Sequence, residues 1–160
     1  MSKSRILPSN FIGTTMAGVQ VEDGQFRIYY QGKDYKLYEM QLDNPDDTQY
    51  SLFNLSDFTP DARINTPIAA FAWNGLQDIR VYYITATSKV QEIIHTAQGG
   101  WFPGDTLGTA VENSSCLYAQ VRASLPQASL RVGFQSTKSP QTITEAYLVD
   151  PNEGWKTRVF

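Results

Sequence analysis

Three arginine–glutamate pairs recur along the chain at nearly constant spacing. They are Arg27 with Glu39, Arg80 with Glu92, and Arg131 with Glu145, separated by 12, 12 and 14 positions. A guanidinium is a rigid multiple donor and an ionised carboxylate only accepts, so together they can bracket neighbouring hydroxyl groups of a neutral ligand. A single such pair would more simply be a surface salt bridge of small energetic value. Because the pair recurs, a ligand clamp and a structural pair are equally good interpretations.

Each arginine lies in a short segment where apolar and polar residues alternate, which is typical of a strand. These segments are Phe26–Tyr30, Ile79–Tyr83 and Leu130–Phe134. A small apolar run precedes each of them, namely Met16–Val19, Ile68–Phe71 and Leu117–Gln120. An apolar-x-Glu segment follows each, namely Leu37–Glu39, Val90–Glu92 and Ile143–Glu145. The repeats then end on Gln49-Tyr50, Gly100-Trp101 and Gly154-Trp155.

This order of segments predicts an all-β fold made of β-propeller blades. Four short strands in each unit of roughly 50 residues are the signature of a blade, and no segment keeps a helical apolar period. We therefore expect one domain over residues 1–160, built from three four-stranded blades at about 13–60, 61–110 and 111–160.

Three blades do not close a ring, because propellers need about four to eight. An open arc would leave sheet faces exposed to water, which favours association. We therefore expect the chain to pair head to tail, most simply as a dimer that forms a six-bladed ring. A nine-bladed ring of three chains is the less favoured alternative.

Composition narrows the classes of partner. The 160 residues carry a net charge of −3, so neither nucleic acid nor an anionic membrane surface is an expected partner. The single cysteine, Cys116, cannot form an intrachain disulfide, and we interpret it as a buried small residue. His95 is the only histidine, and with no metal-ligand spacing or catalytic motif we expect no metal, no cofactor and no catalytic residues. Residues Met1–Pro8 lack a signal-peptide core, which predicts a cytoplasmic protein or one released without a classical signal.

These motifs resemble those of the fungal fucose-specific lectins, six-bladed propellers in which a small apolar run ending in Trp is followed by I-R-V-Y, I-x-E and G-W. The best match is the segment Ile68–Asp105, and the resemblance extends from about Gly13 to Trp155. It implies that L-fucose or a fucosylated glycan binds between blades. The Arg and Glu would bind sugar hydroxyls, and aromatic rings would pack on the C6 methyl group and the apolar face of the sugar.

Carried over residue by residue, the resemblance implies three sites in each chain. The first contains Arg27 and Glu39. The second contains Arg80, Glu92, His95 and Trp101, with Trp73 ending its first strand. The third contains Arg131, Glu145 and Trp155. Val21 and Arg122 stand where the second repeat has Trp73, so we expect only the second site to be complete.

Structural roles are alternative interpretations for His95 and the tryptophans. Trp155 fits a core position slightly better than a ligand contact, and His95 fits a hydrogen-bonded structural role. Trp101 follows two glycines, and a ligand-facing position near a loop is reasonable there.

Three functions fit these features, and a lectin without catalytic activity fits best. The alternative is a cofactor-independent biosynthetic enzyme on the same scaffold, a cyclase or hetero-Diels–Alder catalyst that takes a small hydrophobic natural-product intermediate into the same pocket. The eroded aromatic positions of the first and third repeats favour that alternative. A purely structural role would leave three Arg–Glu pairs unexplained.

Overall fold

The computed structural model describes residues 7, 15–21, 23–124 and 127–160, which form three four-stranded antiparallel sheets. The first sheet contains β1 (Met16–Gln20), β2 (Phe26–Gln31), β3 (Leu37–Leu42) and β4 (Ser51–Asn54). The second contains β5 (Ile68–Trp73), β6 (Asp78–Ile84), β7 (Lys89–Thr96) and β8 (Gly100–Thr109). The third contains β9 (Leu117–Ser124), β10 (Gln127–Phe134), β11 (Thr144–Leu148) and β12 (Lys156–Val159).

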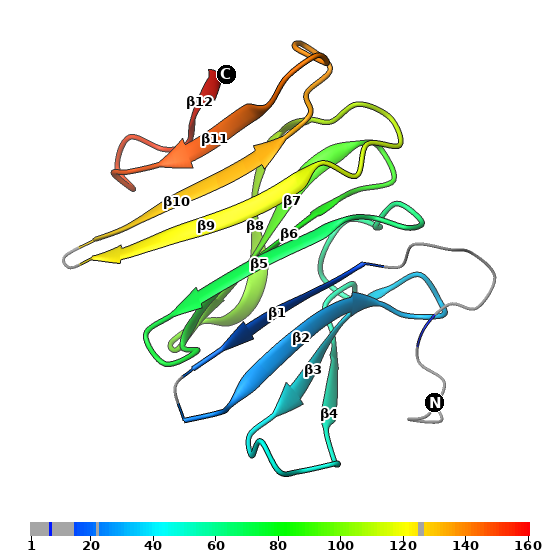
Figure 1. Cartoon of the computed structure of the whole chain (residues 1–160), viewed down its shortest axis with the longest axis vertical. Coiled ribbons are helices and arrows are strands. Elements are labelled where there is room, and N and C mark those ends of the chain that lie inside the picture. Colours follow the sequence, from blue (N-terminus) through cyan, green and yellow to red (C-terminus); the bar gives the residue numbers. More distant parts are fainter. Residues whose placement is uncertain (1–6, 8–14, 22, 125–126) are drawn as a thin grey trace.

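Each sheet is a meander whose strands are adjacent in sequence order, as expected for a propeller blade. The sheets follow one another along the chain, from blue to red in Figure 1, and their first strands β1, β5 and β9 lie side by side. The prediction of an all-β fold with three four-stranded blades is confirmed. The expected start of the first repeat near residue 13, and the segment Met1–Pro8 apart from Leu7, lie outside the described residues. Among the described residues, no helix is long and apolar enough to cross a membrane.

A tight turn with left-handed backbone joins β5 to β6. Residues 74–77 connect β5 to β6, and the Gln77 N–H donates to the Asn74 carbonyl oxygen at 3.1 Å. The two central residues of this turn, Gly75 and Leu76, have φ angles of 62° and 64°, the left-handed pattern of a hairpin turn that matches the twist of the flanking strands. This hairpin fixes the register of Trp73 opposite Asp78, and so places Trp73 on the same face of the sheet as Arg80, two residues further on.

Every blade has two chemically different faces. Its arginine face carries the repeated Arg and Glu, and its apolar face carries the residues next to that Arg in sequence, such as Ile79 and Val81 in the second blade. The arginine face of the first blade packs on the apolar face of the second, and the arginine face of the second packs on the apolar face of the third. The two hydrophobic clusters of the core therefore lie between blades.

Candidate ligand sites between blades

The second blade brings Arg80, Glu92 and Trp73 together on its arginine face. The Arg80 guanidinium lies 5.0 Å from the centroid of the Trp73 ring, and its Nε is 3.8 Å from Glu92 Oε2. Its Nη1 donates to the carbonyl oxygens of Ile79 and His95, at 3.0 and 3.3 Å. The side chain is thus held in one position, and Nη2 has no hydrogen-bond partner among the described residues.

The Glu92 carboxylate is buried and held by two donors. Oε2 accepts a hydrogen bond from the Tyr82 hydroxyl at 2.7 Å, and Oε1 accepts one from the backbone N–H of Asp105 at 3.4 Å. Burial raises the pKa of Glu92 above its ordinary value, although the Tyr82 hydrogen bond and the charge of Arg80 oppose the shift. Trp155 of the third blade lies edge-on to Tyr82 at 6.4 Å between ring centroids. The site therefore draws its polar groups from one blade and an aromatic ring from the next.

The first blade repeats this arrangement with different partners. Glu39 Oε2 accepts from the Tyr29 hydroxyl at 2.7 Å, and Oε1 accepts from Gln41 Nε2 at 2.5 Å. The Arg27 guanidinium turns outward to an ion pair with the exposed Asp43 at 3.0 Å, rather than to Glu39. Trp101 of the second blade lies edge-on to Tyr29 at 6.1 Å. This site has an aromatic wall that the sequence alone did not assign to it.

The structure groups two tryptophans differently from the sequence-based expectation. We expected Trp101 and His95 to join Arg80, but Ile79 pairs with His95, and His95 pairs with Trp101. Residues paired across strands share a face and neighbours in sequence point to opposite faces, so Arg80 faces away from both. Trp101 and His95 therefore belong to the first site.

Trp155 follows the same rule. It was expected beside Arg131 and Glu145, yet it packs in the cluster between the second and third blades, edge-on to Tyr82. Trp155 therefore belongs to the second site. Its packing agrees with the core interpretation and also makes it a wall of that site.

The third blade has a rearranged site at the end of the array. Gly133 replaces the tyrosine found in the other blades, and Tyr118, directly opposite on β9, supplies the hydroxyl to Glu145 Oε2 at 2.7 Å. A Cβ atom at Gly133 would lie 1.9 Å from the Tyr118 ring, so only glycine fits beneath it. Arg158 binds Glu145 Oε1 through Nε and Nη2, at 2.9 and 2.6 Å. Arg131 is exposed and forms no ion pair with a described residue.

These contacts shift the pKa of Glu145. Burial alone would raise its pKa, but the hydrogen bonds from Tyr118 and Arg158, together with the charges of Arg158 and Arg131, hold the pKa below its ordinary value. Burial and the hydrogen bond to Glu145 raise the pKa of the Tyr118 hydroxyl to about 12, so that hydroxyl stays a donor at neutral pH.

Sequence reasoning did not assign the tyrosines to the sites. Each Glu accepts from a buried or partly buried tyrosine hydroxyl, supplied by Tyr29, Tyr82 and Tyr118. A signal was present in the first two blades, because a tyrosine two residues after the Arg must share its face. Arg158 was also not predicted, because the other two repeats have no arginine opposite their glutamate on the last strand.

His95 has a structural partner. Its Nδ1 lies 2.9 Å from the Gln77 carbonyl oxygen, and its ring packs 5.1 Å from Trp101. Within the described residues, no cluster of three or more His, Cys, Asp or Glu side chains could hold a metal ion.

Repeated four-stranded antiparallel blades that pack face to face define the class as a β-propeller, with candidate ligand sites between the blades. Residues 56–159 match the family model described as fungal fucose-specific lectin. The match covers more than half of the chain, which therefore belongs to the fungal fucose-specific lectin family. No curated protein sequence matched.

Solved structures show the same fold. The six-bladed lectin of Aleuria aurantia is 22% identical, with a TM-score of 0.72 over 94% of this chain and 50% of that one. The lectin SapL1, solved in complex with α-methyl fucoside, is 24% identical, with a TM-score of 0.74 over 97% of this chain and 49% of that one. AofleA from Arthrobotrys oligospora is 22% identical, with a TM-score of 0.73 over 92% of this chain and 41% of that one. The chain thus spans about half the length of these proteins.

Proposed function

We propose that the protein is a lectin that binds L-fucose or fucosylated glycans between its blades. The observation that carries the proposal is the combination in the second site: a fixed Arg80 with Nη2 unengaged, a buried Glu92 acceptor, and indole rings from two blades. Family membership and the fucoside bound to a solved relative support the same ligand class.

The chemistry of these groups suits a neutral deoxy sugar. Arg80 Nη2 can donate to ring hydroxyls, and the remaining lone pairs of Glu92 can accept from them. Trp73 and Trp155 supply apolar surface for the methyl group and the C–H face of the sugar. The first site contains the same kinds of groups, with Trp101 as its wall, so we expect a second and weaker site where Asp43 competes for Arg27.

A calorimetric titration with methyl α-L-fucoside tests this function. The unmodified protein should bind saturably, and Arg80→Ala should remove the tighter class of sites while circular dichroism shows an unchanged fold. Lys33→Ala, in the exposed turn between β2 and β3, is the matched control and should bind as the unmodified protein does. A folded protein that ignores millimolar fucoside would contradict the lectin proposal and favour a non-sugar ligand in the same sites.

We further propose that two copies close a six-bladed ring head to tail. Phe26, Ile28 and Met40, on the apolar face of the first blade, are partly exposed. The same positions are buried in the second blade (Ile79, Val81, Ile93) and in the third (Leu130, Val132, Ala146), with exposed fractions of 4% or less. To bury the apolar face of the first blade in the same way, the arginine face of another blade must pack on it. The third blade of a second copy would supply that arginine face.

A further inference from the structure

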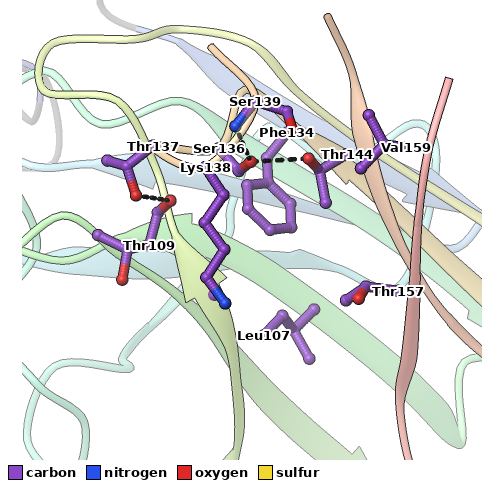
Figure 2. A pocket seen from close by; sticks show the side chains of 11 residues that line it. Leu107, Thr109, Phe134, Ser136, Thr137, Lys138, Ser139, Thr144, Thr157 and Val159 are labelled. Atoms are coloured by element: carbon purple, nitrogen blue, oxygen red, sulfur yellow. Dashed lines mark hydrogen bonds between the residues drawn. The ribbon is translucent and has the colours of Figure 1, made fainter.

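A cavity of about 240 Å³ lies between the second and third blades, at the end of the sheets opposite to Trp73. Leu107 and Thr109 of β8 form one wall, and Thr157 and Val159 of β12 form the other. Phe134 forms the floor (Figure 2). None of these residues belongs to the Arg–Glu sites described above.

The cavity exists because the chain is shorter here than at the corresponding place between the first two blades. Leu55 and Gly108 occupy matching positions in the first and second blades. The Leu55 N–H donates to the Leu37 carbonyl oxygen at the start of β3, and Gly108 pairs with Val90 near the start of β7. Ala62 and Ala110 also match, since each forms an isolated bridge to the turn that follows β6 or β10. Six residues separate the first two positions and only one residue, Thr109, separates the second two.

The longer connection fills its own space. Phe58 packs into the cluster between the first and second blades, and the Pro60 carbonyl accepts a hydrogen bond from the Tyr83 hydroxyl at 2.6 Å. At the position of Tyr83 the third blade has Phe134, which lacks that hydroxyl, and no segment equivalent to Phe58–Pro60 is present. The space between the second and third blades therefore lacks a side chain equivalent to Phe58.

The lining of the cavity combines an apolar floor with one unpaired charge. Leu107, Phe134 and Val159 provide the apolar contacts. The hydroxyls of Ser136 and Thr144 bond each other at 2.8 Å and are already satisfied. Lys138 extends along the cavity toward Leu107 in Figure 2, and its ammonium forms no ion pair with a described residue.

We propose that this cavity binds a small organic carboxylate that carries one apolar group of about the size of a phenylalanine side chain. The apolar group replaces the packing that Phe58 supplies between the first two blades, and the carboxylate accepts from the Lys138 ammonium. The site is independent of fucose binding, because it lies at the far end of the inter-blade space from Trp73 and shares no residue with the Arg–Glu sites.

Titration with 3-phenylpropanoate, followed by NMR chemical shifts of the threonine and valine methyl groups, tests the proposal. Its uncharged analogue 3-phenylpropan-1-ol is the ligand control. We expect the acid to bind more tightly than the alcohol, and Lys138→Gln to weaken the acid about tenfold while leaving the alcohol unchanged. Lys33→Gln, a distant lysine in an exposed turn, should change neither.

A second variant fixes the location. Thr157→Trp should fill the cavity and abolish binding of both probes, while the calorimetric titration with methyl α-L-fucoside stays unchanged. Equal affinity for acid and alcohol would overturn the carboxylate assignment. Absence of binding by either probe, or full binding by Thr157→Trp, would overturn the site itself, whatever the outcome of the fucoside titration.

Discussion

Each blade buries one glutamate on its arginine face, and a tyrosine hydroxyl holds each carboxylate. Glu39, Glu92 and Glu145 have exposed fractions of 1%, 2% and 3%, and each tyrosine oxygen lies 2.7 Å from its carboxylate oxygen. A buried carboxylate without donors would be costly, so the tyrosine makes it possible to keep an acceptor beneath the ligand. The repeated Glu is therefore better understood as part of a Tyr–Glu unit than as half of a salt bridge.

The two carboxylates with shifted pKa values should respond differently to acid. Glu92 has its pKa raised above the ordinary 4.5 by burial, whereas hydrogen bonds from Tyr118 and Arg158 keep the pKa of Glu145 below it. Lowering the pH therefore protonates Glu92 first. Because a protonated carboxyl loses acceptor capacity, we expect fucoside affinity at the second site to fall as the pH passes down through the raised pKa of Glu92.

Calorimetry between about pH 7 and about pH 4 measures this dependence. Glu92→Gln should give weak binding without this pH dependence, and Glu145→Gln should leave the profile of the second site in place. A flat profile for the unmodified protein over that range would show that Glu92 does not contact the sugar in its ionised form.

At the scale of single residues, the sequence predicted the residue types of the sites more accurately than it predicted which of those residues lie together. Arg80 and Glu92 lie together as expected because their spacing places them on one face of adjacent strands. Trp101 was grouped with the wrong site, since the register that sets its face depends on the hairpin between β7 and β8. Counting strand parity from the pairing of Ile79 with His95 would have corrected this assignment.

At the scale of strands, the third blade exchanges a large and a small residue between neighbours. The first two blades pair Ala17 with Tyr29 and Ala69 with Tyr82, whereas the third pairs Tyr118 with Gly133. The tyrosine has moved from the second strand to the first, and its hydroxyl still reaches the glutamate of its own blade. The exchange conserves the hydrogen bond but not the sequence motif, which is why repeat comparison alone missed it.

This exchange predicts strong coupling between the two positions. Gly133→Ala should lower the free energy of unfolding by about 1–3 kcal/mol, because its Cβ would overlap the Tyr118 ring. Adding Tyr118→Ala should remove that overlap, so the double variant should be more stable than the sum of the single changes implies. Urea denaturation of the four proteins of this cycle measures the coupling energy. Additive effects would show that the ring does not occupy the space above Gly133.

Strand pattern predicted the number of blades because period-2 alternation with turn residues is a local signal. The cavity beside Phe134 could not be predicted in the same way. The cavity depends on the absence of a segment like Phe58–Pro60 after β8. That absence becomes visible only when the connections after β4 and β8 are compared, which requires the strand registers of both blades.

At the scale of the whole molecule, the two end faces of the array differ in charge. The arginine face of the third blade carries Arg122, Arg131 and Arg158 around the single buried Glu145, within a chain whose net charge is −3. Arg122 and Arg131 form no ion pair with a described residue. At the far end of the array, the first blade exposes four aspartates in its β1–β2 and β3–β4 turns, Asp23, Asp43, Asp46 and Asp47.

The internal blades indicate how these end faces would meet. Trp73 lines a groove with Gln127 and Ala128, at the β9–β10 turn of the following blade. In the third blade, Arg122 occupies the position that Trp73 has in the second. In the first blade, Asp23 precedes Arg27 by the same four positions by which Gln127 precedes Arg131 in the third, so Asp23 and Gln127 occupy matching positions. In the proposed head-to-tail ring we therefore expect Arg122 of one copy to lie near Asp23 of the other, with an ion pair in place of a tryptophan contact.

We expect the unmodified protein to sediment at twice the mass of one chain, and Arg122→Glu to shift the equilibrium toward the monomer because it places two acidic groups in contact. Asp23→Lys should do the same by bringing two cations together, whereas the two changes combined restore an opposite-charge pair and should recover the dimer. Analytical ultracentrifugation at low and high salt measures all four proteins, and salt should weaken the unmodified dimer.

A monomeric unmodified protein would contradict ring closure by a second copy. A dimer indifferent to both single changes would keep self-association but contradict the proposed contact of the third blade with the first.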